Sequence, residues 1–191
     1  MSSFRRRGKL DSARTIETLA LPRLSGPPGA TVPAPLALEI VPYQACYAQA
    51  FRELNLAWLL AFFSVEERDL RELENPESEF ISNGGQVLVA LDEGTPIGVC
   101  ALRRKSVERF ELAKMAVAEN RRGCGVGRAL LEAAIARARL AGASTIVLLT
   151  HPLLSAAVTL YERTGFVQVP RPEAEYIRAE SGIMMQLQLD P

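Results

Sequence analysis

Three residues in the second half of the chain, Arg122, Gly125 and Gly127, have the types and spacing of a phosphate-binding turn. They lie where an apolar run ends and a segment of helical spacing, Val126 to Leu140, begins. A helix N-terminus leaves backbone N–H groups without partners and carries partial positive charge, and glycine lets a phosphate approach the backbone closely. The turn therefore predicts a diphosphate site, while the alternative of a simple tight turn stays open.

Other phosphate-binding motifs fit this turn poorly. Arg121, Arg122 and Arg128 place positive charge around it, which suits a diphosphate. A dinucleotide fingerprint GxGxxG would need glycine at Arg128 or Leu130, and the Gly-Lys-Ser/Thr of a P-loop does not occur in the chain. Both motifs are excluded.

The turn, Arg122-Gly123-Cys124-Gly125-Val126-Gly127, resembles the signature Arg/Gln-x-x-Gly-x-Gly/Ala of the GCN5-related N-acetyltransferases. A second segment, Leu160-Tyr161-Glu162-Arg163-Thr164-Gly165-Phe166, matches another motif of that family. The resemblance extends from about Leu36 to Asp190. It implies an α/β fold of the GNAT type, with a mixed central sheet of six or seven strands, a splayed fourth and fifth strand pair, and about four helices.

The resemblance also implies acetyl-CoA as co-substrate and a place for it. Pantetheine would lie between the splayed strands and pair with backbone groups near Met115, Ala116 and Val117, where a backbone N–H would also meet the developing oxyanion. Tyr161 would donate a proton to the leaving thiolate, unless its ring only packs in the core. The pyrophosphate would meet the backbone of a run of seven residues: Arg122, Gly123, Cys124, Gly125, Val126, Gly127 and Arg128.

Three positions qualify the resemblance. Many relatives carry an asparagine seven residues before the tyrosine, whereas here this residue is Leu154, so one cofactor contact differs. His151 ends a strand where similar sequences often have asparagine, and we expect a changed substrate pocket. Cys124 is expected to be a small spacer in the turn, with a redox adduct to CoA as the alternative.

Acetylation of an amine also needs a base. A lysine-like amine has a pKa near 10.4, so about one molecule in 2,500 is a nucleophile at pH 7, a shortfall of about 4.6 kcal/mol. Glu111 is the first candidate, because a carboxylate inside the apolar run 110–117 is costly without a function. The alternative is a solvent-facing side chain or an ion pair with Lys114 or an arginine. His151, the one histidine of the chain, is the second candidate.

Alternating strands and helices must position these residues. Gly142 lies where a helix C-cap glycine belongs. Strands are predicted over residues 36–41, 86–91, 96–102, 110–118, 145–150, 165–169 and 183–189, and helices over 47–62, 126–140 and 155–164. The second and third strands form a hairpin around Asp92-Glu93-Gly94-Thr95.

The resemblance implies that the first helix covers the acceptor site. The resemblance implies that Asn55 and Trp58, one turn apart, contact the substrate, while Trp58 as ordinary core is the alternative. The helical spacing predicts a buried stripe of eight residues: Tyr47, Ala50, Phe51, Leu54, Ala57, Trp58, Ala61 and Phe62.

A strongly acidic stretch follows this helix. Residues 66–79 hold seven acids against Arg68 and Arg71. A solvated helix is one interpretation, and attraction of a cationic amine toward the site is the other.

Composition limits the remaining possibilities. The 22 basic and 22 acidic residues cancel, which argues against nucleic acid and anionic membranes as partners, and no apolar run approaches the length of a membrane span. Three dispersed cysteines and one histidine predict a reducing compartment, no metal site and a cytoplasmic location. Residues 1–35, basic and rich in proline, are interpreted as a flexible extension rather than a targeting peptide, and residues 36–191 as the acetyltransferase domain.

The expected function is therefore transfer of acetyl from acetyl-CoA to a primary amine by direct attack in a ternary complex. The acidic stretch favours a small cationic molecule as the acceptor. The alternative is a non-catalytic sensor that binds acyl-CoA, and a homodimer is an open arrangement.

Overall fold

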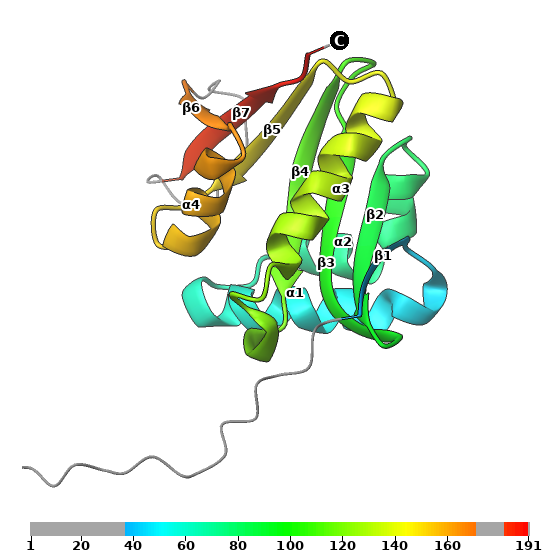
Figure 1. Cartoon of the computed structure of the whole chain (residues 1–191). Coiled ribbons are helices and arrows are strands. Elements are labelled where there is room, and N and C mark those ends of the chain that lie inside the picture. Colours follow the sequence, from blue (N-terminus) through cyan, green and yellow to red (C-terminus); the bar gives the residue numbers. More distant parts are fainter. Residues whose placement is uncertain (1–36, 171–181, 191) are drawn as a thin grey trace, which may run out of the picture. The chain divides into compact units, whose positions relative to one another are not determined.

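The computed structural model describes residues 37–170 and 182–190, so the extension predicted at residues 1–35 lies outside the described residues (Figure 1). Its strands and helices follow the predicted order. They are β1 (Leu38–Pro42), α1 (Ala48–Phe62), α2 (Glu67–Glu74), β2 (Gln86–Asp92), β3 (Thr95–Arg104), β4 (Arg109–Val117), α3 (Val126–Leu140), β5 (Thr145–Thr150), α4 (Ser155–Arg163), β6 (Val167–Val169) and β7 (Ile183–Gln188). Short helical turns occupy Ala45–Tyr47, Glu77–Ile81 and Glu119–Arg121.

The strands form one mixed sheet in the order β1-β2-β3-β4-β5-β7-β6. Only β4 and β5 are paired in parallel among these strands, and the other neighbours are antiparallel. The predicted hairpin is confirmed: Glu93 and Gly94 both have positive φ, as a two-residue hairpin loop requires. The predicted mixed sheet of six or seven strands is thus confirmed with seven.

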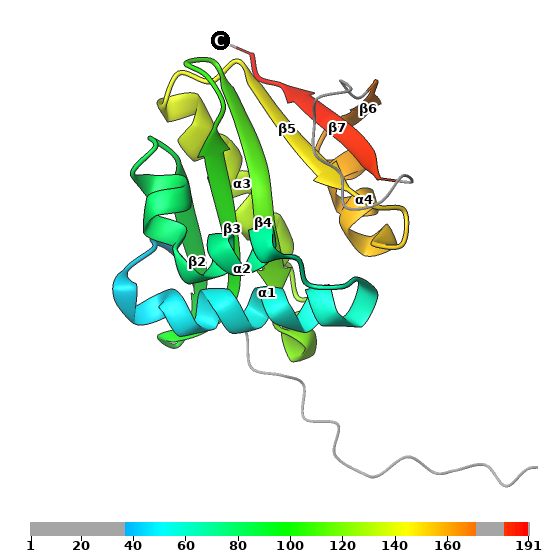
Figure 2. The same ribbon diagram turned by 180° about the vertical axis from the view of Figure 1, so that it is seen from behind.

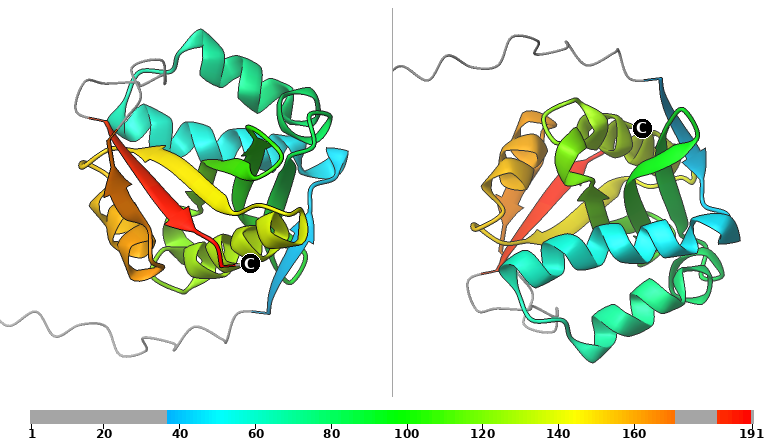
Figure 3. Two further views of the ribbon diagram at one scale, coloured as in Figure 1. Left: turned by 90° about the horizontal axis from the view of Figure 1, so that it is seen from above. Right: turned by 90° about the horizontal axis from the view of Figure 1, so that it is seen from below.

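Helices cover both faces of the sheet. In Figure 1, α3 and α4 lie in front of it, and in Figure 2, seen from behind, α1 and α2 lie in front. The two views along the vertical axis show the sheet between these layers (Figure 3). One apolar core lies under α3, around Leu130 and Phe110, and a second lies under α1, around Phe51 and Phe80.

The predicted stripe on α1 is partly wrong. Phe51, Asn55 and Leu59 are the buried residues, four positions apart along one row, whereas Ala57, Ala61 and Phe62 are exposed. This row is the most deeply buried because each step of four residues returns to nearly the same face, while the half-buried Leu54, Leu56 and Trp58 also pack against the core. Asn55 therefore lies in the core, which the spacing of apolar residues did not indicate.

A glycine cap ends α3. Gly142 has φ +83°, and the N–H groups of Gly142 and Ala143 donate to the carbonyls of Arg139 and Ala138 at 2.9 and 3.0 Å. This is a Schellman motif, so the predicted glycine cap of α3 is confirmed. None of the helices in the described part of the chain combines the length and apolar character that crossing a membrane requires.

Candidate active site

The site lies where β4 separates from β5. The parallel pairing covers Arg109 to Leu112 of β4 and ends at the pair Leu112–Leu148, so residues 113–117 of β4 and 149–150 of β5 are not paired with each other. On its other side β4 carries one extra residue against β3, between the pairs Val99–Ala116 and Ala101–Ala113. This bulge bends β4 away from β5, and the resulting opening is visible in Figure 1. The predicted splayed strand pair is confirmed.

Two cavities occupy this opening. The larger cavity has a volume of about 290 Å³ and runs along the separated part of β4 toward α4 and the turn before α3. The smaller cavity, about 140 Å³, lies toward α2. They adjoin, since both are lined by Trp58, Leu112, Ala113, Lys114, Leu149, Thr150 and Leu154. A molecule in the larger cavity can therefore meet one in the smaller.

Tyr161 lies in the wall of the larger cavity, on α4. Its ring packs on Phe166 with centroids 5.8 Å apart, and its hydroxyl is 3.8 Å from the sulfur of Met115. Burial, with a smaller contribution from Cys100, raises the pKa of the phenol above its usual value of 10.0. The hydroxyl therefore carries its proton at neutral pH, which a proton donor at this position requires.

Met115, Ala116 and Arg122 also line the larger cavity, as the sequence predicts for residues near a cofactor. Val117 lies one residue beyond this wall, half-buried and opposite Gly98 of β3. Trp58 and the exposed Phe62 contribute from α1. The larger cavity thus connects Tyr161 to the start of the turn at Arg122.

The turn itself has the backbone that close approach of a phosphate requires. Gly123 and Gly125 have φ of +78° and +85°, a region that other residues rarely adopt. Gly125 is the N-cap of α3, so the helix begins without a capping side chain and its first N–H groups, at Val126, Gly127 and Arg128, face the turn. An anion can therefore be held by main-chain donors and by the partial positive charge of the helix end.

The side chains of the turn have different environments. Val126 is buried and packs in the core, and Cys124 is exposed. Arg121 points to the hairpin, where its Nη2 is 3.0 Å from Oδ2 of Asp92. Arg128 makes an exposed ion pair with Glu132. Among the three arginines of the turn, Arg122 is the one that lines the cavity.

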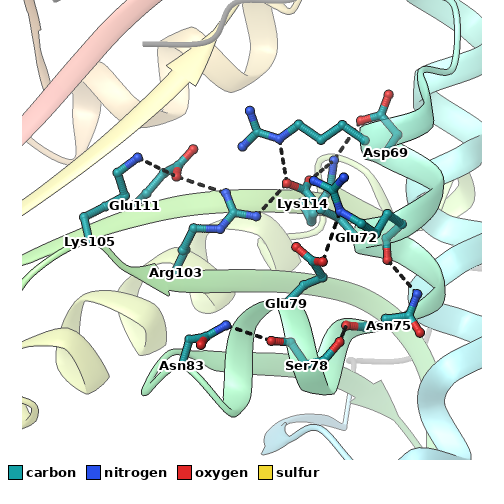
Figure 4. A network of polar contacts seen from close by, with 12 residues as sticks. Asp69, Glu72, Asn75, Ser78, Glu79, Asn83, Arg103, Lys105, Glu111 and Lys114 are labelled. Atoms are coloured by element: carbon teal, nitrogen blue, oxygen red, sulfur yellow. Dashed lines mark hydrogen bonds and ion pairs between the residues drawn. The ribbon is translucent and has the colours of Figure 1, made fainter. Parts of the chain in front are cut away.

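A network of ion pairs, which the sequence did not predict, forms the α2 side of the smaller cavity (Figure 4). Lys114 Nζ is 2.8 Å from both Asp69 Oδ1 and Glu72 Oε2. Arg103 joins Glu72 at 2.6 Å and Glu111 at 3.0 Å. Arg68 adds a contact to Glu72 at 2.8 Å. We call these six residues the charge network.

Local structure holds the network in place. Asp69 accepts the N–H of Glu66 in a capping box at the start of α2, which fixes the carboxylate toward the sheet. The guanidinium of Arg103 stacks on the buried ring of Phe80, 4.7 Å from its centroid. Lys114 is the bulge residue of β4, with φ +50°, so the same backbone irregularity that opens the sheet aims its side chain at α2.

Two acids of the stretch 66–79 therefore do not belong to a solvated helix surface. Asp69 and Glu72 are 2% and 3% exposed, which corrects that interpretation for these residues. Burial alone would raise the pKa of Glu72, but the charges and hydrogen bonds of Lys114, Arg68 and Arg103 outweigh it and lower the pKa below 4.5. Glu72 is a carboxylate at neutral pH.

The two candidate bases, Glu111 and His151, both line the smaller cavity. Glu111 is buried and makes its ion pairs through Oε2, with Arg103 at 3.0 Å and Lys105 at 3.9 Å, so the predicted alternative of an arginine partner describes its environment. His151 Nδ1 accepts the N–H of Leu153 at 3.1 Å. A neutral imidazole that accepts at Nδ1 carries its proton on Nε2, which favours Glu111 over His151 as a proton acceptor.

Asn55 and Trp58 do not play equal parts. Trp58 lines both cavities, whereas Asn55 is fully buried and lines neither. The amide of Asn55 donates to the carbonyl of Phe51 at 2.9 Å and accepts the indole N–H of Trp58 at 3.2 Å. Asn55 thus holds Trp58 in place, and because it is fully buried it does not itself face either cavity.

Other lining residues were missed or differ from expectation. Leu154, at the position where many relatives carry an asparagine, is the N-cap of α4 without a capping side chain and lines both cavities with apolar atoms. Phe63 lies against His151, with ring centroids 5.4 Å apart. Lys114 could have been found from the sequence, because a lysine inside an apolar strand requires a buried acid as partner.

Comparisons with known proteins agree with this architecture. The family model described as "Acetyltransferase (GNAT) family" matches residues 48–166. A curated mouse protein, "Probable N-acetyltransferase family 8 member 5" from Mus musculus, is 34% identical over 89 residues, which are 47% of this chain. The matched part spans only 38% of the length of that relative.

Solved structures share the fold. An acetyltransferase of the GNAT family from Staphylococcus aureus has a TM-score of 0.73 at 22% identity and covers 81% of this chain and all of its own. The structure of yncA from Salmonella typhimurium, with its cofactor acetyl-CoA, has a TM-score of 0.64 at 22% identity and covers 81% of this chain and 95% of its own. With a family model matching more than half of its length, the chain belongs to the acetyltransferase (GNAT) family.

Proposed function

We propose that this protein is an N-acetyltransferase that moves the acetyl group of acetyl-CoA to a primary amine by direct attack in a ternary complex. The observation that carries the proposal is the meeting of the two cavities at the opening between β4 and β5, with the protonated phenol of Tyr161 in the wall of the larger one. Membership of the acetyltransferase family supports the reaction type.

The donor fits the larger cavity and the turn beside it. The N-terminus of α3 offers main-chain donors for the pyrophosphate, and Arg122 adds a cation at the cavity wall. The separated edge of β4, residues 115–117, offers backbone groups for pantetheine. The yncA structure of the same fold contains acetyl-CoA, which supports this assignment.

The chemical step needs one proton donor and one proton acceptor. The amine lone pair attacks the thioester carbon, the C–S bond breaks, and the thiolate takes the proton of the Tyr161 hydroxyl. The ammonium formed on attack gives its proton to a base. Glu111, in the smaller cavity, is our first candidate for that base, directly or through a water, and His151 is the second.

The acceptor is a small amine that enters through the smaller cavity. The acid-rich stretch 66–79 predicts a cationic acceptor, but the two acids of this stretch that line the cavity, Asp69 and Glu72, are already paired with Lys114, Arg68 and Arg103. Support for the attraction of a cation is therefore weaker than the sequence indicates.

The proposal is tested with purified protein, acetyl-CoA and a panel of primary amines, by detecting released thiol, together with calorimetric titration of CoA. We expect amine-dependent thiol release and CoA binding. Tyr161→Phe should lower kcat at least about tenfold and leave CoA affinity within about twofold, since only the proton donor is removed. Tyr43→Phe is the matched control. It also removes a phenol hydroxyl, but Tyr43 lines neither cavity.

Two outcomes would contradict the proposal. CoA binding without thiol release for any amine would favour a non-catalytic acyl-CoA sensor. Absence of calorimetric binding at millimolar CoA would overturn the donor assignment as well.

A further inference from the structure

The acidic and basic side chains that line the smaller cavity balance within the part of the chain that the structure describes. These residues hold three carboxylates, Asp69, Glu72 and Glu111, and three cations, Arg68, Arg103 and Lys114, so their formal charges cancel. Each carboxylate has a cation within 3.0 Å. Figure 4 shows the side chains of Asp69 and Glu72 from α2, Arg103 from β3, and Glu111 and Lys114 from β4 gathered together.

This balance restricts the charge of a ligand. A ligand with only a positive charge would compete with the three cations for the same carboxylates, and its binding would leave these paired charges with an excess positive charge. A ligand that carries both signs can exchange partners with both sets and leave the cavity neutral.

The chemistry adds a second restriction. The attacking amine must be deprotonated, so a ligand whose only charge is its ammonium group loses its electrostatic anchor at the moment of attack. A carboxylate on the same ligand keeps its charge throughout and can remain bound to a guanidinium while the amine loses its proton.

The lining of the cavity also includes apolar side chains. They are those of Trp58, Phe63, Leu149 and Leu154. A ligand that matches both the charged and the apolar part of this lining has a charged head and an apolar side chain.

We propose that the acceptor is a small zwitterion: a primary amine and a carboxylate on one head, with an apolar side chain lying against Trp58 and Leu154. This inference rests on the acetyltransferase function proposed above and narrows its acceptor class.

Arg68 is the cation of the network best placed to exchange partners with the carboxylate. Its side chain is 33% exposed, against 16% for Arg103 and 10% for Lys114, so it stands at the rim of the network. Moving or removing it still leaves Glu72 with Arg103 and Lys114. It is therefore a specificity-determining residue whose loss leaves the buried acids paired.

The test compares acceptors that differ only in the carboxylate. L-leucine, L-leucinamide and isoamylamine share one side chain. The carbon that bears the amine carries a carboxylate in leucine, a neutral amide in leucinamide and only hydrogen in isoamylamine. L-phenylalanine and 2-phenylethylamine form an aromatic pair, and cadaverine represents a purely cationic acceptor. For each, kcat/KM is measured by thiol release with acetyl-CoA and corrected for the fraction of free amine. We expect leucine to exceed isoamylamine and leucinamide at least about tenfold, the value of one charged hydrogen bond.

Two variants on α2 assign the effect to a residue. Arg68→Ala should lower the ratio of kcat/KM for leucine over isoamylamine at least about fivefold, because the carboxylate loses its charged partner. Arg71→Ala is the matched control: Arg71 lies on the same helix, is 56% exposed and pairs with Glu79, outside both cavities. It should leave the ratio unchanged.

The outcomes separate the two proposals. If cadaverine or the decarboxylated amines react as well as the amino acids or better, the zwitterion proposal is overturned while the acetyltransferase function stands. An unchanged ratio in Arg68→Ala would remove Arg68 from the recognition of the carboxylate. If none of the six acceptors releases thiol, both proposals fail.

Discussion

Replacing Lys114 by methionine should destabilise the protein more than any surface charge change. Methionine keeps most of the length and apolar stem but removes the cation that lies 2.8 Å from both Asp69 and Glu72. Removing one partner of a buried ion pair costs about 3–5 kcal/mol, because the other charge stays buried without compensation. The lower end applies here, since Glu72 retains Arg68 and Arg103 and Asp69 retains the N–H of Glu66.

A loss of about 3 kcal/mol is measurable in two ways. Urea denaturation should give a lower free energy of unfolding for Lys114→Met, and the melting temperature should fall by about 6–12 °C for a chain of this size. Glu132→Gln is the control, because it breaks an exposed ion pair with Arg128 and should cost at most about 0.5 kcal/mol.

Two further variants show which physical effect is responsible. Asp69→Asn added to Lys114→Met removes the uncompensated charge and should restore more than half of the lost stability. Lys114→Gly relieves the positive φ of the bulge but still removes the cation, so it should remain destabilised. A loss below about 1 kcal/mol in Lys114→Met, or wild-type stability in Lys114→Gly, would refute the view that this ion pairing stabilises the bulge.

Three other predictions concern ionisation and the turn. Because burial raises the pKa of Tyr161, kcat/KM should rise with pH as the amine deprotonates and show no descending limb up to pH 10; a limb centred near 10 would mean an unperturbed phenol. The pKa of Glu72 is lower in the folded protein than in the unfolded chain, so ionised Glu72 stabilises the fold above pH 4.5. This stability is lost as the pH falls through the folded-state pKa. The urea midpoint should therefore drop between pH 6 and pH 3 by more in the wild type than in Glu72→Gln. Gly125→Ala should cost about 1 kcal/mol of stability and weaken CoA binding several-fold in calorimetry. Gly94 also has φ near +80° and open space where a Cβ would lie. Gly94→Ala should therefore have the same backbone cost and leave the affinity for CoA unchanged.

Local signals in the sequence were sufficient for the framework of the fold. The strands and helices follow from short-range spacing, and the hairpin at Gly94 and the cap at Gly142 follow from the positive φ that these turns demand. The turn at Arg122 and the segment of Tyr161 were recognised because each motif is continuous in the chain. The structure places Arg122 and Tyr161 in the wall of one cavity.

The smaller cavity could not be predicted in the same way. Its charge network joins residues far apart in the chain, such as Asp69 and Lys114, and their pairing depends on how α2 lies against β4. Periodicity also failed on α1, because the spacing of apolar residues did not indicate that the polar Asn55 takes a core position and hydrogen-bonds Trp58. Both errors arise where a buried polar group is satisfied by a distant or unexpected partner.

Those errors fall in and beside the smaller cavity, which we propose binds the acceptor. A buried ion network is a weak source of stability, since apolar residues of similar volume often pack as well or better. Stability alone is therefore a weak explanation for six charged side chains beside a cavity, although breaking one pair of the network destabilises the fold. The donor side shows the opposite pattern, because its glycines, main-chain donors and single tyrosine are encoded locally and serve one invariant ligand. Recognition of the acceptor must instead be sought in contacts between separate elements, which is why a residue such as Arg68, unremarkable in the sequence, becomes the most informative position to change.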